Sequence, residues 1–336
     1  MKTQLKNKII SDSKINALLN ANRYSDAAIK LNLLQKKEWK IFSDNSSALK
    51  NVKQRSIQFN GYKIHFQFNP QRLLSSTTDV SDRAIKSRKC FLCLNNLPEE
   101  QKGILIEDKF ILLCNPFPIF NHHFTIIYTE HQPQLINNHF LDLLSLAKKM
   151  NDRFAVFYNG PQCGASAPDH LHFQTVEKKC LPIFDQLNLI KNKFGKLHKS
   201  QPNISVHSID DGLRKFILLQ SLNMQLIENY FHKIYTVLNK NDDENYEPML
   251  NILCTYNGDT GWTVLVFSRS QHRSSHYFNS GESKIVISPA SVDLGGVCIF
   301  PREEDYAKIG TESIKEIFSE IFPREIEFNK IISAIA

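Results

Sequence analysis

Residues 159–175, "NGPQCGASAPDHLHFQT", combine a loop of small residues with two histidines and a glutamine. In an extended segment alternate side chains share a face, so His170, His172 and Gln174 are expected to project together. The small residues before them would let backbone N–H groups approach an anion closely. A neutral imidazole can attack phosphorus directly, and a glutamine amide can donate hydrogen bonds to phosphate oxygens as charge develops. The stretch therefore favours phosphate chemistry over the polar face of an exposed strand.

A second group of side chains suits a metal ion. Cys90 and Cys93 form a C-x-x-C pair, which fits either a zinc ion or a redox couple. No second C-x-x-C follows, so any further ligands must be histidines, and His131 and His170 are the candidates. Two cysteines and two histidines make a tetrahedral zinc site of the structural type. The spacing alone favours this site and a pair of buried free thiols equally.

Other polar residues carry weaker signals. Arg72 and Arg88 could each bind phosphate, and a surface position for either is about as well supported. The segment "SRSQHR" at 268–273 could contact a sugar phosphate, although its place after a strand favours a solvated strand end. The pair at 122–123, two histidines after a Pro-rich turn, is interpreted as structural.

The composition indicates an ordinary globular protein. A chain of 336 residues can form one large domain or two medium ones. Its 41 basic and 34 acidic residues give a net charge of +7 that is spread along the chain, so nucleic-acid binding is not indicated. The sequence shows no membrane-length apolar run, no secretory cleavage signal and no disulfide framework among its seven cysteines. A cytoplasmic protein with reduced thiols is therefore expected.

The chain divides into three predicted parts. Residues 1–58 are expected to form an N-terminal helical extension, with two helices around 14–36 and a polar break and short helical stretch at 42–51. A first half, 59–195, carries the histidine motif. Its hydrophobic periodicity predicts, in order, a strand at 61–70, an antiparallel strand pair within 110–131, a helix at 136–150 and a strand at 153–160.

The second half, 196–336, appears in the sequence as a repeat of the first. A strand pair is predicted at 249–268, joined near Asn257–Gly258, with further strands at 284–291 and 295–305 and a closing helix around 309–321. The pattern "FTIIYTEHQPQ" of the first half is similar to "WTVLVFSRSQHRSS" of the second. These similarities predict two related α+β halves.

The stretch from Asn159 to Gln174 resembles the active-site segment of the galactose-1-phosphate uridylyltransferase branch of the histidine triad superfamily. That branch includes dinucleoside tetraphosphate phosphorylases and GDP-hexose phosphorylases. The motif "DHLHFQ" is most similar to the GDP-hexose phosphorylase form and to an uncharacterised bacterial family of nucleotidyltransferases, which the blocks "FQFNPQRLLSS", "RKCFLCLNNLPEEQ", "NPFPIFNHHFTI" and "HQPQ" also resemble. The resemblance covers residues 35–335. It implies an α+β fold of two histidine-triad-like repeats, with an antiparallel sheet and flanking helices.

The resemblance also assigns site residues. It implies that His172 takes the nucleotidyl group as a covalent intermediate and that Gln174 contacts the transferred phosphate. Asn159, Gly164 and Ser166 match the loop that holds the phosphates, and we add Arg72 of the family-like block "FQFNPQRLLSS" as a further nucleotide contact. The zinc ligands of the uridylyltransferases match, in the same chain order, Cys90, Cys93, His131 and His170.

Departures from the family pattern bear on the reaction. The uridylyltransferases have H-P-H-G-Q, whereas this chain has Leu171 and Phe173 between the polar positions, which favours a phosphorylase-like member. Hydrolases of the superfamily carry a third histidine where Gln174 stands, and glutamine cannot protonate a leaving group, so transfer is favoured over hydrolysis.

The predicted reaction passes a nucleoside monophosphate from a nucleotide sugar or dinucleoside polyphosphate to phosphate or a sugar 1-phosphate. A structural zinc ion is expected, and no interaction with nucleic acid or with a membrane is expected. The sequence does not decide whether the protein forms a homodimer. The alternatives are a nucleotide hydrolase and a zinc-stabilised module that binds nucleotides or nucleic acid without catalysis.

Overall fold

The structure is a computed structural model that describes residues 2–73, 79–201, 203–239 and 246–336. The helices are α1 (Lys2–Lys8), α2 (Ser13–Asn20), α3 (Tyr24–Glu38), α4 (Lys40–Ala48), α6 (Asp82–Ser87), α7 (Phe140–Met150), α8 (Pro182–Asp185), α9 (Leu187–Phe194), α10 (Met224–Leu238), α11 (Ser275–Phe278), α12 (Ser291–Leu294), α13 (Glu303–Lys308), α14 (Thr311–Ile321) and α15 (Glu325–Ile335). The strands are β1 (Lys53–Phe59), β2 (Tyr62–Phe68), β3 (Gly103–Ile106), β4 (Phe110–Cys114), β5 (His123–Tyr128), β6 (Phe154–Asn159), β7 (His172–Glu177), β8 (Gly195–Gln201), β9 (Ile204–Asp210), β10 (Lys215–Ser221), β11 (Leu250–Asn257), β12 (Gly261–Ser268) and β13 (Val297–Phe300).

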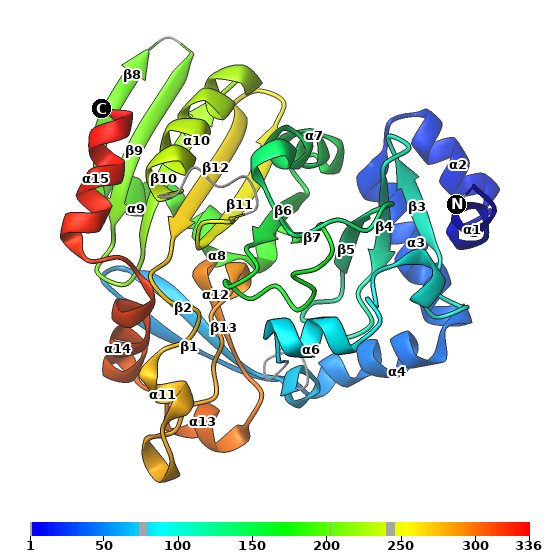
Figure 1. The fold of residues 1–336 in the computed structure, drawn as a ribbon, viewed down its shortest axis with the longest axis horizontal. Helices are drawn as coiled ribbons and strands as arrows, with labels where there is room; N and C mark the ends of the chain where they lie inside the picture. The colour runs from blue at the N-terminus through cyan, green and yellow to red at the C-terminus, as the bar shows by residue number, and fades with distance from the viewer. Residues whose placement is uncertain (1, 74–78, 202, 240–245) are drawn as a thin grey trace.

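A ten-stranded antiparallel sheet runs through both halves in the order β3-β4-β5-β7-β6-β11-β12-β10-β9-β8 (Figure 1). Each half contributes five adjacent strands with the same connectivity, three strands, a helix and two strands. The halves meet where β6 pairs with β11, with Asn159 opposite Asn251. The predicted α+β fold of two repeats is confirmed.

The two sequence patterns that were matched between the halves do not occupy equivalent strands of the two repeats. Chain order and sheet position make β7 the counterpart of β12 and β5 the counterpart of β10. The two matched patterns, however, lie on β5 and β12. Their likeness reflects the β-branched and aromatic residues that any buried strand prefers.

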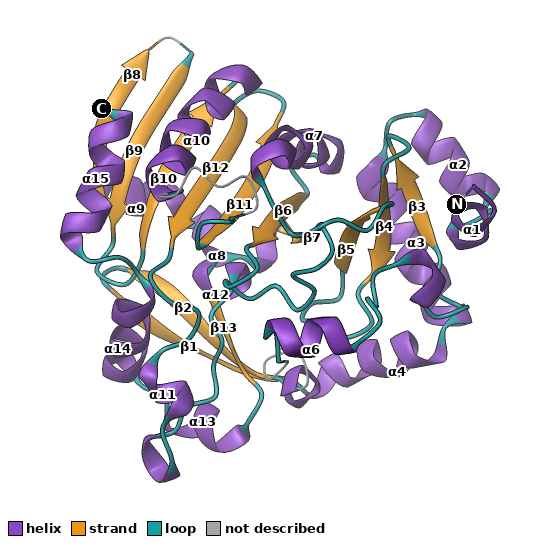
Figure 2. Ribbon diagram, viewed as in Figure 1, coloured by secondary structure: helices purple, strands orange, loops and turns teal. Residues whose placement is uncertain are grey.

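Helices cover both faces of the sheet (Figure 2). On one face α7 and α10 lie side by side, and the rings of Phe140 and Phe231 stack with their centroids 3.8 Å apart. The helices α2, α3, α4 and α15 pack into the same core. The other face is covered by α8, α9, α14 and a three-stranded sheet in which β2 pairs with β1 and β13. Both cores bury aliphatic and aromatic side chains almost completely, which is the main stabilising contribution to the fold.

The N-terminal region differs in part from its prediction. The two helices expected around 14–36 are present as α2 and α3, and α4 replaces the predicted polar break. Helical structure does not extend to residue 58, because β1 begins at Lys53 and pairs with β2. The two strands are joined by Asn60 and Gly61, both with positive φ, the arrangement typical of a two-residue hairpin turn.

Elements of the second half also differ from their predictions, and the strand expected at 295–305 is limited to β13, because α13 begins at Glu303. Residues 284–291, predicted as a strand, have no strand structure although Ile285, Val286 and Ile287 are buried. The backbone N–H of Val286 donates to the Asp305 carboxylate instead of to a neighbouring strand. The closing helix is confirmed as α14, and α15, which was not predicted, follows it.

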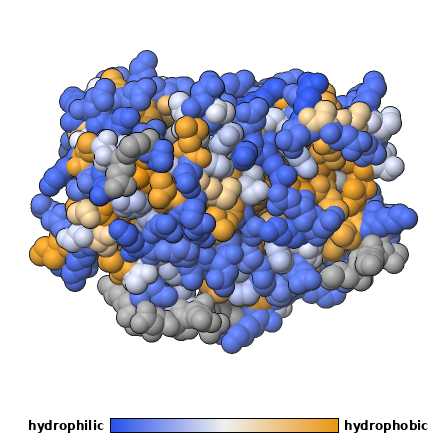
Figure 3. Space-filling model, turned by 90° about the horizontal axis from the view of Figure 1, so that it is seen from above, coloured by the Kyte–Doolittle hydropathy of each residue, from blue (hydrophilic) through white to orange (hydrophobic). Residues whose placement is uncertain are grey.

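No described helix combines the length and the apolar character that a membrane crossing requires. On the face shown in Figure 3, hydrophilic side chains dominate and hydrophobic ones lie in small groups among them.

Candidate active site

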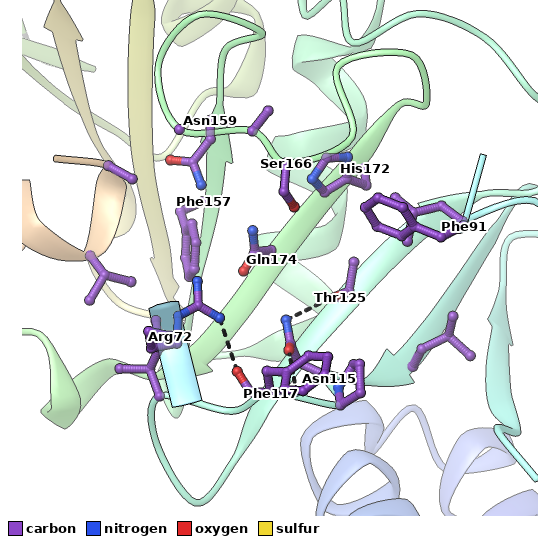
Figure 4. Close-up of a pocket in the computed structure, with 18 of the residues that line it drawn as sticks. Arg72, Phe91, Asn115, Phe117, Thr125, Phe157, Asn159, Ser166, His172 and Gln174 are labelled. Atoms are coloured by element: carbon purple, nitrogen blue, oxygen red, sulfur yellow. Dashed lines mark hydrogen bonds between the residues drawn. The ribbon is translucent and has the colours of Figure 1, made fainter. Parts of the chain in front are cut away.

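The strand β7 presents two of its polar side chains to a cavity. Its alternation sends Phe173 into the core that contains α7 and α10. His172 and Gln174 therefore project from the opposite face of the sheet, where both line the cavity (Figure 4). His170 does not join them, contrary to the expectation from the sequence, because it precedes the strand.

His172 is held as a neutral imidazole. Its Nδ1 lies 2.8 Å from the carbonyl oxygen of His170 and donates to it, so Nε2 carries the lone pair. The residue is 3% exposed, and burial lowers its pKa to about 4. At neutral pH the ring is therefore uncharged, as a nucleophile attacking phosphorus must be.

Gln134 hydrogen-bonds to the backbone of both β6 and β7, at the last residue of β6 and the first residue of β7. Its amide nitrogen donates to the carbonyl oxygens of Asn159 at 3.0 Å and His172 at 2.9 Å, and its amide oxygen accepts from the His172 N–H at 2.8 Å. Gln134 is completely buried. No sequence pattern marks Gln134 as a site residue, because only the fold brings it beside the motif.

The orientation of the Gln174 amide is fixed by His123. The Ile119 N–H donates to Nδ1 of His123, so the proton of this buried ring is on Nε2. Burial lowers the pKa of His123 to about 3, so the ring is neutral. Its Nε2–H donates to Oε1 of Gln174 at 2.8 Å, and the Gln174 amide nitrogen is left to face the cavity.

The loop after β6 lines the same cavity. The Asn159 side-chain oxygen accepts from Asn251 at 2.8 Å and from the Ser291 N–H at 2.9 Å, so its amide nitrogen is directed toward the cavity (Figure 4). Gly164 has a φ of +97°, and a Cβ there would lie 2.5 Å from the Cβ of Ala290. Only glycine fits this approach between the halves. Ser166 follows it in the loop and also lines the cavity.

The cavity has a volume of about 530 Å³, within the range of small-molecule sites. Arg72 lines it and donates to the carbonyl oxygen of Phe117 at 3.0 Å (Figure 4). Trp39 and Ile41 of the N-terminal region also line it. The structure thus brings every predicted catalytic and phosphate-binding residue to one cavity, which is lined by both halves.

The segment 268–273 is not the solvated strand end that its sequence favoured. Arg269 is 6% exposed and donates to the Asn251 side chain at 2.9 Å. His272 and Arg273 line the cavity, and Arg273 donates through Nε to the Ser288 hydroxyl at 3.1 Å. Because β6 and β11 are neighbours in the sheet, the end of β12 lies close to the motif of the first half.

The four predicted metal ligands come together in a separate cluster, which can hold a metal ion. Their donor atoms all lie within 4.8 Å of one another; the residues are Cys90, Cys93, His131 and His170. Sγ of Cys90 is 3.4 Å from Nδ1 of His170, and Sγ of Cys93 is 3.2 Å from Nδ1 of His131. The other ring nitrogen of His170 donates to the carbonyl oxygen of Tyr128 at 2.9 Å, which leaves Nδ1 as the ligand atom. The donor set and its spacing fit tetrahedral zinc.

Arg88 ties this cluster to the motif. Its guanidinium lies 2.6 Å from the carboxylate of Asp169, the residue before His170. Its carbon atom Cζ also lies 4.9 Å from the centre of the Phe91 ring, between the two cysteines. Arg88 is therefore paired with a carboxylate of the protein. It does not line the cavity.

Comparisons with known proteins agree with this fold. Residues 31–177 match the family model of a domain of unknown function, DUF4922, and residues 189–336 match that of the GDPGP1-like C-terminal domain. No curated protein sequence matches the chain. Crystal structures of yeast Ap4A phosphorylase Apa2, alone, with AMP and with Ap4A, share the fold with TM-scores of 0.53, 0.54 and 0.53. Their identities are 16%, 17% and 15%; the matches cover 84%, 87% and 85% of this chain and 93%, 96% and 97% of theirs. The predicted resemblance to the galactose-1-phosphate uridylyltransferase branch is confirmed.

Proposed function

We propose that this chain, which carries a GDPGP1-like C-terminal domain behind its histidine motif, transfers a nucleoside monophosphate through His172. The observation that carries the proposal is the state of His172: a buried, neutral imidazole whose Nδ1 is already bonded and whose ring lines a ligand-sized cavity. The first half, residues 59–195, supplies the nucleophile, and the second, 196–336, completes the wall.

The reaction consists of two in-line displacements at one phosphorus. In the first, Nε2 of His172 forms a P–N bond while the P–O bond to the leaving group breaks, and the electron pair goes to the leaving phosphate oxygen. Nδ1 keeps its proton and its bond to the His170 carbonyl, which stabilises the positive charge that the ring gains. In the second, an oxygen of the acceptor phosphate attacks, the P–N bond breaks, and the neutral ring returns.

The partners follow from this chemistry. The donor is a nucleotide sugar or a dinucleoside polyphosphate, and the acceptor is inorganic phosphate or a sugar 1-phosphate. Yeast Apa2, which shares the fold, has been crystallised with AMP and Ap4A, which supports a nucleotide ligand. Arg72 and Arg273 give the cavity positive charge, which favours binding of the phosphate groups of both the donor and the acceptor.

Gln174 favours phosphate over water as the acceptor. Its amide nitrogen faces the cavity and can donate to the transferred phosphate, but the neutral amide cannot take the proton that an attacking water must lose. An anionic phosphate oxygen attacks without losing a proton. Asn159 and Ser166 are placed to bind the same phosphate from the loop.

Zinc is the proposed occupant of the four-ligand cluster, held by Cys90, Cys93, His131 and His170. When bound, it supplies a structural crosslink and no group to the reaction. His170 lies two residues before His172, and its carbonyl accepts from the catalytic ring, so the crosslink would fix the start of the catalytic strand.

The proposal is tested by the dependence of turnover on phosphate. With a dinucleoside polyphosphate or nucleotide sugar and isotopically labelled phosphate, the label should appear in a nucleoside diphosphate, and turnover should rise with phosphate concentration. Release of nucleoside monophosphate without phosphate would identify a hydrolase. Tight nucleotide binding without turnover of any donor would favour the non-catalytic module.

The role of His123 gives a prediction of its own. His123→Phe removes the donor that orients Gln174, so kcat should fall by about tenfold or more with a smaller change in KM. His123→Gln can still donate to Gln174 and should recover part of the rate. The matched control is His122→Phe, because His122 pairs with Glu177 at 3.0 Å and does not line the cavity. Equal losses in the 122 and 123 variants would contradict this role.

A further inference from the structure

Glu247 carries a largely buried carboxyl group that neither the motif nor the metal cluster uses. It lies between α10 and β11, and its oxygens accept from the Tyr158 hydroxyl at 2.8 Å and the Tyr235 hydroxyl at 3.1 Å. The Ile136 N–H contacts both oxygens at 3.2 Å. Tyr158 and Ile136 belong to the first half and Tyr235 to the second, so this carboxyl group joins the halves.

The hydroxyl of Tyr158 has one proton and two neighbouring acceptors. It lies 2.8 Å from Glu247 Oε1 and 2.9 Å from the carbonyl oxygen of Gln134. If Glu247 is ionised, Tyr158 can donate to only one of them. If Glu247 is protonated, its O–H donates to Tyr158, and Tyr158 donates to Gln134. Of the two arrangements, only the second uses both contacts of the Tyr158 hydroxyl as hydrogen bonds.

The surroundings favour the protonated form. Burial raises the pKa of Glu247 from its ordinary 4.5 to about 8, although the hydrogen bonds it accepts act in the opposite direction. Among the described residues, the titratable groups near it are Tyr158 from β6, Tyr235 from α10, Cys163 of the loop after β6, and Tyr246, which precedes Glu247 in the chain. Among the described residues no lysine, arginine or histidine pairs with it, so no cation there opposes protonation.

We infer that Glu247 is a positioning residue, which shares a proton with Tyr158 and through it holds Gln134 beneath the catalytic strand. Gln134 in turn bonds both the N–H and the carbonyl of His172. When Glu247 loses its proton, the Tyr158 hydroxyl turns to the carboxylate, the Gln134 carbonyl loses its donor, and the backbone at His172 loosens. The effect on catalysis rests on the proposed function, whereas the shared proton does not.

The proton is detected by the infrared absorption of a protonated carboxylic acid. In the wild-type protein this band should be present at neutral pH, disappear as the pH rises through about 8, and be missing in Glu247→Gln. A carboxyl group whose pKa is raised by folding binds its proton more tightly in the folded state, so it lowers stability as pH rises from about 4.5 to about 8. The difference in Tm between Glu247→Gln and wild type should therefore grow over that window. A wild-type protein without this band at neutral pH, or a Glu247→Gln variant with the same band as wild type at neutral pH, would overturn the inference.

The catalytic effect is read from variants of the same position. Glu247→Ala should lower kcat by up to about a hundredfold, since small displacements at a catalytic centre have effects of that size. Glu247→Gln can both accept and donate, imitates the protonated acid, and should restore the rate and abolish an ionisation near pH 8. Tyr158→Phe should resemble Glu247→Ala, and the exposed Glu312→Gln is the control. If Glu247→Gln keeps the wild-type pH profile, the positioning role is wrong. If no donor supports transfer at all, the proposed function fails while the infrared result still decides the shared proton.

Discussion

Replacement of His172 by alanine should lower nucleotidyl transfer by roughly three to six orders of magnitude, the range found when a covalent nucleophile is removed. Without this ring the P–N bond can neither form nor break, and the residues that bind phosphate cannot replace the missing nucleophile. The overall fold should survive, because the side chain lies at the cavity wall and not inside either core. Initial rates with a competent donor, together with Tm, measure both effects.

His272→Ala is the matched control for this variant. His272 is a histidine of the same cavity, and burial likewise lowers its pKa to about 4. Its ring nitrogen Nε2, however, lies 3.4 Å from the Ser288 hydroxyl in the second half. The variant should still form the covalent adduct. Retained transfer in the 172 variant with loss in the 272 variant would move the nucleophile to the second half.

Loss of the metal cluster should have the second-largest effect. Purified protein should contain about one zinc ion per chain, and Cys93→Ala should remove it, since a tetrahedral site with three ligands holds zinc far more weakly. Structural zinc contributes several kcal/mol or more to folding, a large share of the total stability of a domain. A strong chelator should lower the Tm of wild type and leave that of Cys93→Ala unchanged.

The control for the metal prediction is Cys180→Ala, because Cys180 is a partly buried free thiol outside the cluster. It should retain zinc, and its Tm should still respond to the chelator. Metal content by mass spectrometry and thermal unfolding are the measurements. A metal-free wild-type protein with full stability and transfer would contradict a structural zinc site.

The parts of this site that could be predicted from the sequence are those whose residues lie in one short segment. The residues of β7 and its preceding loop are contiguous, so their alternation and small side chains could be read directly. The spacing of the cysteines and histidines pointed to the four residues of the metal cluster but favoured a metal site and free thiols equally, so the resemblance was needed to favour zinc.

The residues that support the motif could not be found in the same way. His123 contacts Gln174 only because β5 pairs with β7, which places residues 51 positions apart side by side. Gln134 and Glu247 act through backbone groups and a tyrosine hydroxyl, for which no local pattern exists. The charged residues after β12 were predicted to be solvent-exposed, because the sequence does not show that β6 pairs with β11.

Element errors have a similar cause. Residues 284–287 have strand-like composition, but the Asp305 carboxylate takes the backbone N–H that a neighbouring strand would need. The Asn60–Gly61 turn, by contrast, is a dipeptide typical of hairpins, but the edge strand before it begins with four consecutive polar residues, 53–56, so no hairpin was predicted there.

The central claim is a nucleotidyl group bound covalently to His172. The most direct test is intact-protein mass spectrometry at neutral pH after incubation with nucleotide sugars and dinucleoside polyphosphates, without phosphate. The account predicts a mass increase of one nucleoside monophosphate, located on the peptide that contains His172, lost on addition of phosphate and absent from His172→Ala. A donor that is turned over with no such increase, or with the increase on another residue, would contradict it.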